Sequence, residues 1–293
     1  MDPLLDALSL RVDVHGVPAI DGLSVTSTGE HVLVLGAASA LFEAAAGLRA
    51  AARGGLRVDG RVPIEGVRAG AIAGAPLDPP MPPRWTVRQY VTWSARLAGH
   101  SRRVANDLAG ESLSRMALGA MGATKLGKSV TAVRRATVLA AALATGAMTL
   151  LVEDAITGLP PDVVPQFART MVRALADRRT AYFAGRLQLE SPVALAADEA
   201  IVVFGSHVAA QGDPAEIAAA DRACSLRMVG DVRAFALAVK EAGGRVVGGG
   251  VDGETPSRLS IDRGPLATCD LLRIAEASDA VVLELRPIGL AFA

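Results

Sequence analysis

GEHVLVLGAASALFEAAAGL, residues 29–48, is the stretch that decides the fold of this 293-residue chain. Its first part, HVLVLG (31–36), is apolar with little alternation, which indicates a strand buried on both faces of a parallel sheet. The chain then passes through Gly36 into an Ala-rich segment, Ser39 to Ala52, which we predict to be a helix with Ser39 as a candidate N-cap. A buried strand that turns through glycine into a helix is the topology of a phosphate-binding loop.

The turn itself lacks the groups that phosphate binding requires. A working loop has about eight residues, GxxxxGK[ST], whose N–H groups surround the phosphates while the lysine neutralises them and the hydroxyl holds Mg²⁺. Here only Ala37 and Ala38 separate Gly36 from Ser39, so the second glycine and the cation are missing. The first lysine of the chain is Lys125, and no shift of register restores the cation. By itself the segment also fits an ordinary strand-to-helix turn.

Charge and composition argue against several classes of protein. Thirty Lys+Arg balance thirty Asp+Glu, which argues against nucleic-acid binding. The chain is 51% hydrophobic and 3% aromatic, which suits Ala, Val and Leu helices packed on a buried sheet. The charge-free run 136–152 is shorter than the roughly 20 residues of a spanning helix, so we predict a buried helix followed by a buried strand. With acidic residues where a signal peptide is basic, we expect a cytosolic protein with Cys224 and Cys269 reduced.

Strands and helices alternate up to about residue 222, which predicts a largely parallel sheet covered by helices. Beyond that point the order becomes βαββαβ, the order of a ferredoxin-like split βαβ fold. We therefore expect two domains, 1–222 with a helical insert at about 87–128, and 223–293. The elements expected in the first domain are strands at 8–14, 23–28, 31–36, 148–152, 180–184, 200–204 and 207–212. The expected helices are at 39–52, 87–98 and 163–177, with one more that starts at 132 and precedes the strand at 148.

A second junction, TLLVEDAITGLPPD, ends an apolar strand in Glu153 and Asp154. Adjacent carboxylates at the carboxyl end of a strand lie where α/β sheets bind ligands, and they could hold a metal-bound water or act as a base. A solvated pair at the start of a loop is the alternative, and the segment alone does not decide between them.

In order, these segments resemble the nucleotide-binding subunit of an ABC transporter, specifically the cytosolic ATPase partner of ABC-2-type drug exporters. The resemblance runs from about residue 8 to residue 293. It implies a P-loop-NTPase-like (ABC ATPase) fold with a parallel or mixed sheet and a helical insert, followed by a small α+β domain of order βαββαβ. The segments that carry it are GEHVLVLG…AAAGL, WTVRQ with TWSARLAG, AVRRATVLAAAL, LLVEDAITGLPPD, AADEAIVVFGSHVAAQGDPAEIAA and the tail ELRPIGLAFA.

The reactive positions of that family are replaced here, one after another. The inverted pair Glu153 and Asp154 places the shorter carboxylate where the family has its base. No aromatic residue occupies the adenine-stacking position near Val14 and His15. The other replaced positions are the phosphate loop, reduced to Gly36, Ala37, Ala38 and Ser39; the magnesium-sensing glutamine, on Leu77; the LSGGQ signature, on Ser129, Val130, Thr131, Ala132 and Val133; the loop aspartate, on Pro160; and the switch histidine, on Arg186.

These losses predict a subunit without ATPase activity. Each missing charge-assisted hydrogen bond to a phosphate forfeits about 1.5 to 3 kcal/mol. We expect no catalytic residue, no metal and no cofactor, and ATP with Mg²⁺ only if the motifs are divergent and still work. In that alternative, Glu153 and Asp154 act with an arginine in place of the lysine.

The resemblance also implies partners and a location. We expect an ABC-2-type permease, a homologous ATPase subunit or both as partners, a dimer, no nucleic acid, and a peripheral position at the inner face of the cell membrane. A third hypothesis is a soluble regulatory module whose βαββαβ tail binds an effector.

Two further groups are interpreted from their composition. Arg134 and Arg135 are expected to be a solvated helix start rather than a phosphate clamp. The aromatic corner, which we define as Trp85, Tyr90 and Trp93, is either a packed corner or a coupling surface for a permease, and both interpretations stay open.

Overall fold

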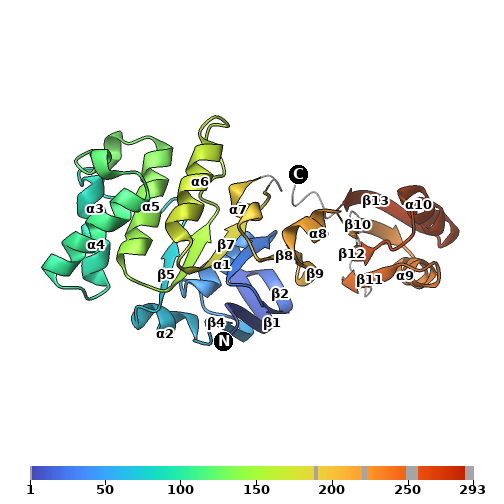
Figure 1. Ribbon diagram of the computed structural model, residues 1–293. Helices are drawn as coiled ribbons and strands as arrows, with labels where there is room; N and C mark the ends of the chain where they lie inside the picture. Colours follow the sequence, from blue (N-terminus) through green and yellow to red (C-terminus); the bar gives the residue numbers. More distant parts are fainter. Residues whose placement is uncertain (1, 188–190, 220–222, 249–256, 288–293) are drawn as a thin grey trace.

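The computed structural model describes residues 2–187, 191–219, 223–248 and 257–287. Their strands form three sheets, with orders β2-β1-β4, β5-β6-β7-β3-β8-β9 and β11-β12-β10-β13. Figure 1 shows an elongated molecule with a helical insert at one end and a small domain at the other. The predicted fold class is confirmed: a mixed α/β sheet with a helical insert, followed by a small antiparallel α+β unit.

The N-terminal sheet is a hairpin extended by a third strand. β1 (Leu5–Val14) and β2 (Val17–Thr26) are joined by His15 and Gly16, whose φ angles of 52° and 80° fit the tight two-residue turns that connect antiparallel strands. β4 (Arg53–Val58) pairs with β1 on its other side. The buried side chains of this sheet pack against α1 (Ala38–Ala45). Phe42 of α1 meets Phe183 edge to face, with the ring centroids 5.8 Å apart.

The central sheet has six strands, of which five are parallel. They are β5 (Ile72–Ala75), β6 (Thr149–Glu153), β7 (Arg179–Ala184), β3 (His31–Leu35) and β8 (Glu199–Phe204), and β9 (His207–Gly212) adds an antiparallel edge. Successive residues of β3 face opposite cores: Val32 and Val34 pack with α1, whereas Leu33 and Leu35 pack with the helices on the other face. Burial on both faces explains why the run HVLVL lacks polar alternation.

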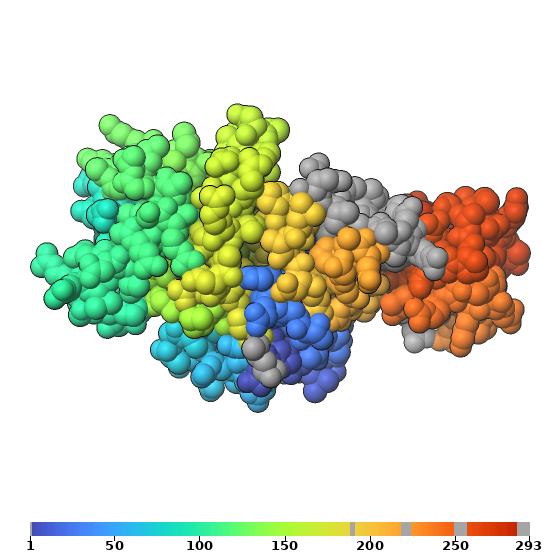
Figure 2. All heavy atoms as spheres, viewed as in Figure 1, coloured from blue at the N-terminus to red at the C-terminus, as the bar shows by residue number. Residues whose placement is uncertain are grey.

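Helices on the second face carry the insert. α5 (Thr131–Ala144), α6 (Val164–Leu175) and the short α7 (Pro192–Leu195) contribute to the same core as the insert helices α3 (Val87–Leu97) and α4 (Arg102–Arg115). Figure 2 shows the insert projecting from the side of the molecule away from the small domain. The remaining elements are α2 (Pro63–Arg68), α8 (Pro214–Ala219) and the 3₁₀ turns η1 (Gly119–Met121) and η2 (Leu126–Lys128). No helix of the described residues combines the length and apolar character of a membrane crossing.

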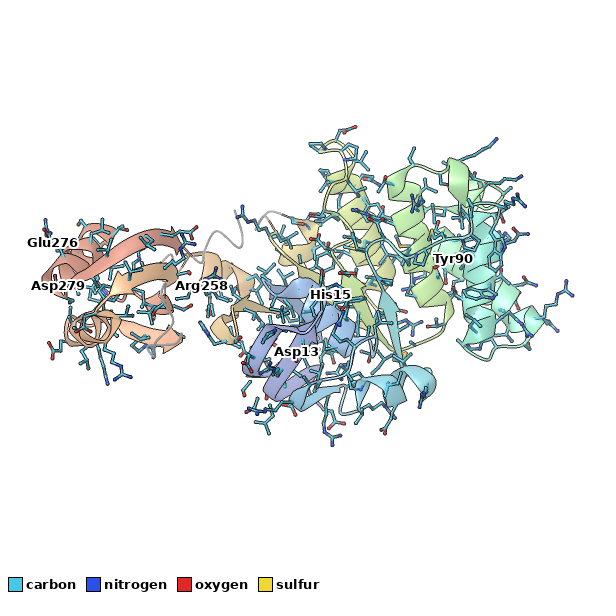
Figure 3. All side chains as sticks on the ribbon, turned by 180° about the vertical axis from the view of Figure 1, so that it is seen from behind. Asp13, His15, Tyr90, Arg258, Glu276 and Asp279 are labelled. Atoms are coloured by element: carbon cyan, nitrogen blue, oxygen red, sulfur yellow. The ribbon has the colours of Figure 1, made fainter. Side chains whose placement is uncertain are left out.

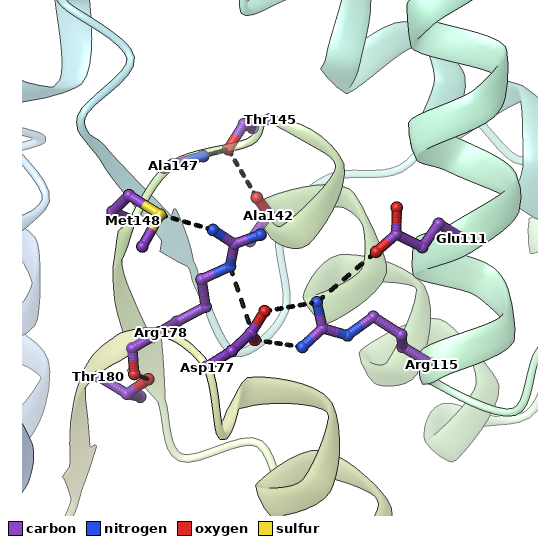
Figure 4. A network of polar contacts seen from close by, with 9 residues as sticks. All are labelled: Glu111, Arg115, Ala142, Thr145, Ala147, Met148, Asp177, Arg178 and Thr180. Atoms are coloured by element: carbon purple, nitrogen blue, oxygen red, sulfur yellow. Dashed lines mark hydrogen bonds and ion pairs between the residues drawn. The ribbon is translucent and has the colours of Figure 1, made fainter.

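An ion-pair network fastens α4 to the central sheet (Figure 4). Arg115 on α4 donates two hydrogen bonds to the carboxylate of Asp177, which follows α6; the bond from Nη1 measures 3.2 Å. Arg178 approaches the same carboxylate at 3.8 Å and donates to the Met148 sulfur at 2.7 Å. The hydrogen bond from Arg115, together with its charge, lowers the pKa of Asp177.

The small domain has its own core and the strand order of a split βαβ fold. Leu226, Phe235 and Leu259 are fully buried within it. The expected domain boundary at residue 222 and the end of the tail, residues 288–293, lie outside the described residues. Its elements are β10 (Ala223–Gly230), α9 (Val232–Glu241), β11 (Arg245–Gly248), β12 (Ser257–Asp262), α10 (Thr268–Ala277) and β13 (Ala280–Pro287).

Two local expectations were wrong. The helix expected over 39–52 spans only Ala38–Ala45, since Gly47 with φ of 69° ends it in the left-handed conformation that favours glycine. Ser39 is not its N-cap; Ala37 is, and no side chain caps the helix. The Ala-rich composition predicted the helix but not its end, because alanine favours helix wherever it stands.

Candidate functional site

The turn after β3 is as short as the sequence indicates. Gly36 and Ala37 alone link β3 to α1. Gly36 has a φ of 107°, and a Cβ at this position would lie 1.9 Å from the carbonyl oxygen of Val203 on β8. Packing alone explains the glycine at this position, because only a residue without a side chain fits against the neighbouring strand.

Two N–H groups at this turn are hydrogen-bonded within the chain. Gly36 N donates to Ala184 O at 3.1 Å, and Ala38 N donates to Gly36 O at 2.8 Å. The first cation that follows in sequence, Arg49, donates to Glu43 Oε2 at 2.6 Å and to Asp13 O at 3.1 Å. No lysine or arginine lies between Gly36 and Arg49 in the sequence, so the turn lacks the lysine that a phosphate loop places against a triphosphate.

The carboxylate pair lies at the carboxyl end of β6. Glu153 is the last residue of that strand, and its Oε2 accepts a hydrogen bond from Leu77 N at 3.0 Å. Two positions that the sequence singled out, 76 residues apart, thus contact each other. The contact engages one of the two carboxylate oxygens of Glu153.

Asp154 starts the loop that follows, in a left-handed conformation with φ of 25°. Its N–H donates to Phe183 O at 2.8 Å, and Thr157 N donates to its Oδ1 at 3.3 Å. Burial raises the pKa of Asp154. Hydrogen bonds from the Gly185 and Thr157 backbone lower it, but by less. The pair is therefore split: one carboxylate caps an amide of another segment, and the other orders its own loop.

Arg135 corrects the expectation of a solvated helix start. Its side chain is 6% exposed, and its Nη1 donates to Ala155 O at 3.2 Å and to Thr157 O, while its Nη2 lies 3.6 Å from Asp78 Oδ2. The beginning of α5 passes beside the β6–α6 loop, which brings the guanidinium onto the loop carbonyls. Arg135 is thus part of the cluster at the end of β6, and Arg134 beside it stays partly exposed.

Two members of this cluster carry no signal in the sequence. Asp78 pairs with Arg135, and Tyr182 on β7 is 4% exposed. Burial raises the pKa of Tyr182, and the Asp154 carboxylate adds to it. An aspartate among prolines and a tyrosine within an apolar strand are both ordinary, which is why the pattern missed them.

The positions of the signature segment form a plain helix entry. Ser129 Oγ donates to Lys125 O at 3.1 Å, and the N-cap of α5 is Val130, 67% exposed and without a side-chain cap. Thr131, Ala132 and Val133 are its first helical residues. Val130, Thr131 and Val133 carry β-branched side chains where a phosphate cradle requires backbone N–H groups to approach closely.

The switch position lies beside the β6–α6 loop, whereas the adenine-stacking position lies at the N-terminal hairpin. Arg186 is exposed after β7 and, with Arg169, lines a cavity of about 580 Å³ that also includes the loop through Pro161. Val14 and His15 are at the hairpin of the N-terminal sheet.

The chain has no lysine before Lys125, so the turn at Gly36 lacks the cation of a phosphate loop. Within the described ranges, no group of three or more His, Cys, Asp or Glu side chains could hold a metal ion. Glu153 is engaged by Leu77, and the turn at Gly36 offers no cation.

The sequence matches no protein-family model and no curated protein. Solved structures do match. A structure described as the ATP-binding subunit of an ABC transporter has 14% identity and a TM-score of 0.60, covering 73% of this chain and 91% of its own. cbiO1 from Clostridium perfringens, part of the transporter complex cbiONQ, has 17% identity and a TM-score of 0.62, covering 75% and 92%. MJ1267, an ATP-binding cassette of an ABC transporter, has 15% identity and a TM-score of 0.63, covering 74% and 95%.

At these identities the likeness establishes the fold. The chain has the fold of ABC-transporter ATP-binding subunits, and about a quarter of it lies outside each of these matches.

Proposed function

We propose that this chain is a catalytically silent subunit with the ABC-ATPase fold, which serves as a structural or regulatory partner of a membrane permease or of an active ATPase. The observation that carries the proposal is the turn at Gly36, which is two residues long, lacks a cation and directs its N–H groups to Ala184 and to itself. The scaffold is kept while the phosphate-binding groups are absent.

The remaining polar groups support the same conclusion, because they bind one another. Glu153 accepts from Leu77, and Arg135 donates to Ala155 and Thr157. A ligand that needed these groups would first have to break buried hydrogen bonds, each worth about 1 kcal/mol net and more when charged.

The aromatic corner supports a partner on the insert. Trp85 packs edge to face on Trp93 at 5.5 Å, and Tyr90 lies 6.3 Å from Trp93. Trp85 and Tyr90 contact the main core, but Trp93 is 44% exposed and Leu97, one turn further on α3, is 66% exposed. The corner is thus packed on one side and open on the other, and exposed aromatic and apolar side chains of this kind are enriched at interfaces.

We infer that this face of α3 docks on an ABC-2-type permease, with the chain peripheral at the inner face of the cell membrane, and that the chain pairs with a second copy or an active homologue. cbiO1, which shares the fold, is part of the complex cbiONQ. Affinity purification of a tagged copy from detergent-solubilised membranes tests the partner: a permease should copurify, and Trp93→Ala with Leu97→Ala should remove it. A tagged copy that returns alone contradicts the docking and favours a soluble regulatory module.

Nucleotide binding tests catalytic silence directly. Titration calorimetry with ATP and Mg²⁺ should show no binding tighter than about 10 μM, or roughly −7 kcal/mol, and the purified chain should release no phosphate. An active ABC ATPase measured in parallel is the positive control. Binding tighter than that limit contradicts the proposal.

A second candidate, a divergent ATP hydrolase, is favoured by one observation: Asp154 is a partly buried carboxylate with a raised pKa at the end of a strand. In that case Glu153→Gln and Asp154→Asn should each abolish a measurable release of phosphate. If there is no release to abolish, this candidate is excluded.

A further inference from the structure

One histidine joins the central sheet to the small domain. His207 is the first residue of β9, and its Nε2 lies 2.8 Å from Ser260 Oγ on β12. Ser260 is fully buried, although serine on the face of a small sheet is ordinarily in contact with water. The contact therefore brings the His207 ring of the large domain against a buried side chain of the small domain.

The small domain is shaped to receive this ring. Gly248, which pairs with Ser260 in the sheet, lies so close that a Cβ on it would be 2.2 Å from Cδ2 and 2.4 Å from Cγ of His207. On the other side, Phe204 of β8 meets the imidazole at a ring-centroid distance of 6.3 Å and an angle of 63°. His207 is thus held between an aromatic ring of the large domain and a glycine and a serine of the small one.

The strands around the ring carry charges of both signs. Among the described residues these are Asp21 on β2, Glu199 on β8, Arg245 on β11, and Arg258 and Asp262 on β12. Asp262 is paired with Arg245 at 3.3 Å. Figure 3 shows Arg258 at the end of the small domain nearest to the large one, whereas Glu276 and Asp279 lie at the far end. A proton added to the imidazole would create a half-buried cation, and no carboxylate of the described residues forms an ion pair with His207.

We propose that His207 is a proton-sensitive latch: neutral, it holds the small domain against β9 through Ser260 and Gly248; protonated, it releases the domain. The two states are a docked and an undocked arrangement of the same folded domains. The small domain keeps its own core in both states. The core residues Leu226, Phe235 and Leu259 pack within the small domain and not against β9.

The direction of the effect follows from burial. Burial lowers the pKa of His207 from its ordinary value of 6.5. A lowered pKa in the docked state means that the undocked state binds more protons between the two values, so docking is favoured above pH 6.5 and is lost as pH falls through the docked-state pKa. A single proton changes the docking equilibrium by at most about tenfold per pH unit.

Distance measurement between spin labels on the full chain tests the latch. One label is placed on Cys269, which is exposed on the small domain, and the other on Ala120→Cys in the insert, while Cys224 is buried and out of reach of the label. At pH 7.5 we expect one narrow distance distribution. From pH 6.5 to pH 5 a second distribution should grow at its expense, with unchanged circular dichroism.

Three variants distinguish a latch from a general loosening of the chain. His207→Gln keeps a hydrogen-bonding side chain that does not titrate, so its distribution should not change with pH. Gly248→Ala should shift the distribution at pH 7.5 toward the one that the parent chain shows at pH 5. His31→Gln, the matched control, should keep the parent's response because His31 lies on β3, away from the small domain. The latch is overturned if the parent shows no change with pH, if His207→Gln still responds, if His31→Gln loses the response, or if Gly248→Ala stays docked.

Discussion

The turn after β3 and the carboxyl end of β6 lie in the same sheet with only β7 between them, and they differ in how their polar groups are used. At the turn, Gly36 and Ala37 leave no side chain that could bind an anion. At β6, the charged groups remain, but Glu153 and Arg135 bond to backbone groups of neighbouring segments. The two regions thus differ: the turn has no polar side chain, whereas the polar groups beside β6 are bonded within the chain.

The close approach of Gly36 to β8 predicts the largest effect on stability. Gly36→Val combines a Cβ 1.9 Å from Val203 O with a φ of 107°, and we expect it to lower the free energy of unfolding by about 4 kcal/mol or more. Urea denaturation of the purified chain measures the loss.

Gly22→Ala is the matched control for this variant. Gly22 has a similar φ of 92° but nothing within 4 Å of the added Cβ, so it should cost only the backbone strain, about 1 to 2 kcal/mol. Equal losses for the two variants would mean that the contact with β8 does not matter.

Internal pairing predicts the next largest effect. Arg135→Met leaves the carbonyls of Ala155 and Thr157 without their donor, and we expect a loss of about 3 kcal/mol in urea denaturation. Arg134→Met, on the partly exposed neighbour, should change stability by less than about 0.5 kcal/mol. If the two variants behave alike, Arg135 does not hold the loop.

Asp154→Asn should stabilise the protein, by less than about 1 kcal/mol. Burial raises the pKa of Asp154 in the folded state, so the carboxylate disfavours folding as pH rises from the ordinary aspartate value through the folded-state pKa. Asparagine still accepts from Thr157 N and tolerates positive φ. Denaturation at pH 7 and at pH 3.5 should show a gain at the higher pH that shrinks at the lower one, and a gain that is the same at both would point to the backbone alone.

The smallest effect belongs to the ion pair that holds α4 to the sheet. Asp177→Asn should cost about 0.5 kcal/mol at low salt and less in 1 M NaCl, because the carboxylate is largely exposed. Arg115 lowers the pKa of Asp177, so the stabilisation is present above the ordinary aspartate value and is lost as pH falls through the lowered one. A loss that persists in high salt at neutral pH would show that packing, not charge, fastens α4.

Local patterns predicted most of the elements but only part of the site. The apolar run through Leu35 and the carboxylates at Glu153 stand at strand ends as expected, because side-chain alternation and burial are written in consecutive residues. The role of Arg135 was predicted wrongly, since an arginine at a helix start is solvated unless another segment covers it. The carbonyl of Ala155, to which Arg135 donates, lies 20 residues later in the sequence.

The amino-acid sequence by itself determined the α/β pattern, the short uncharged turn after β3 and the absence of lysine before residue 125, because these are properties of neighbouring residues or of the composition. The tertiary structure alone decided that Leu77 caps Glu153, that Arg135 is buried and that His207 reaches Ser260. Such contacts join segments 20 to 76 residues apart, and they depend on which strands become neighbours in the sheets, which the period of a local pattern does not specify.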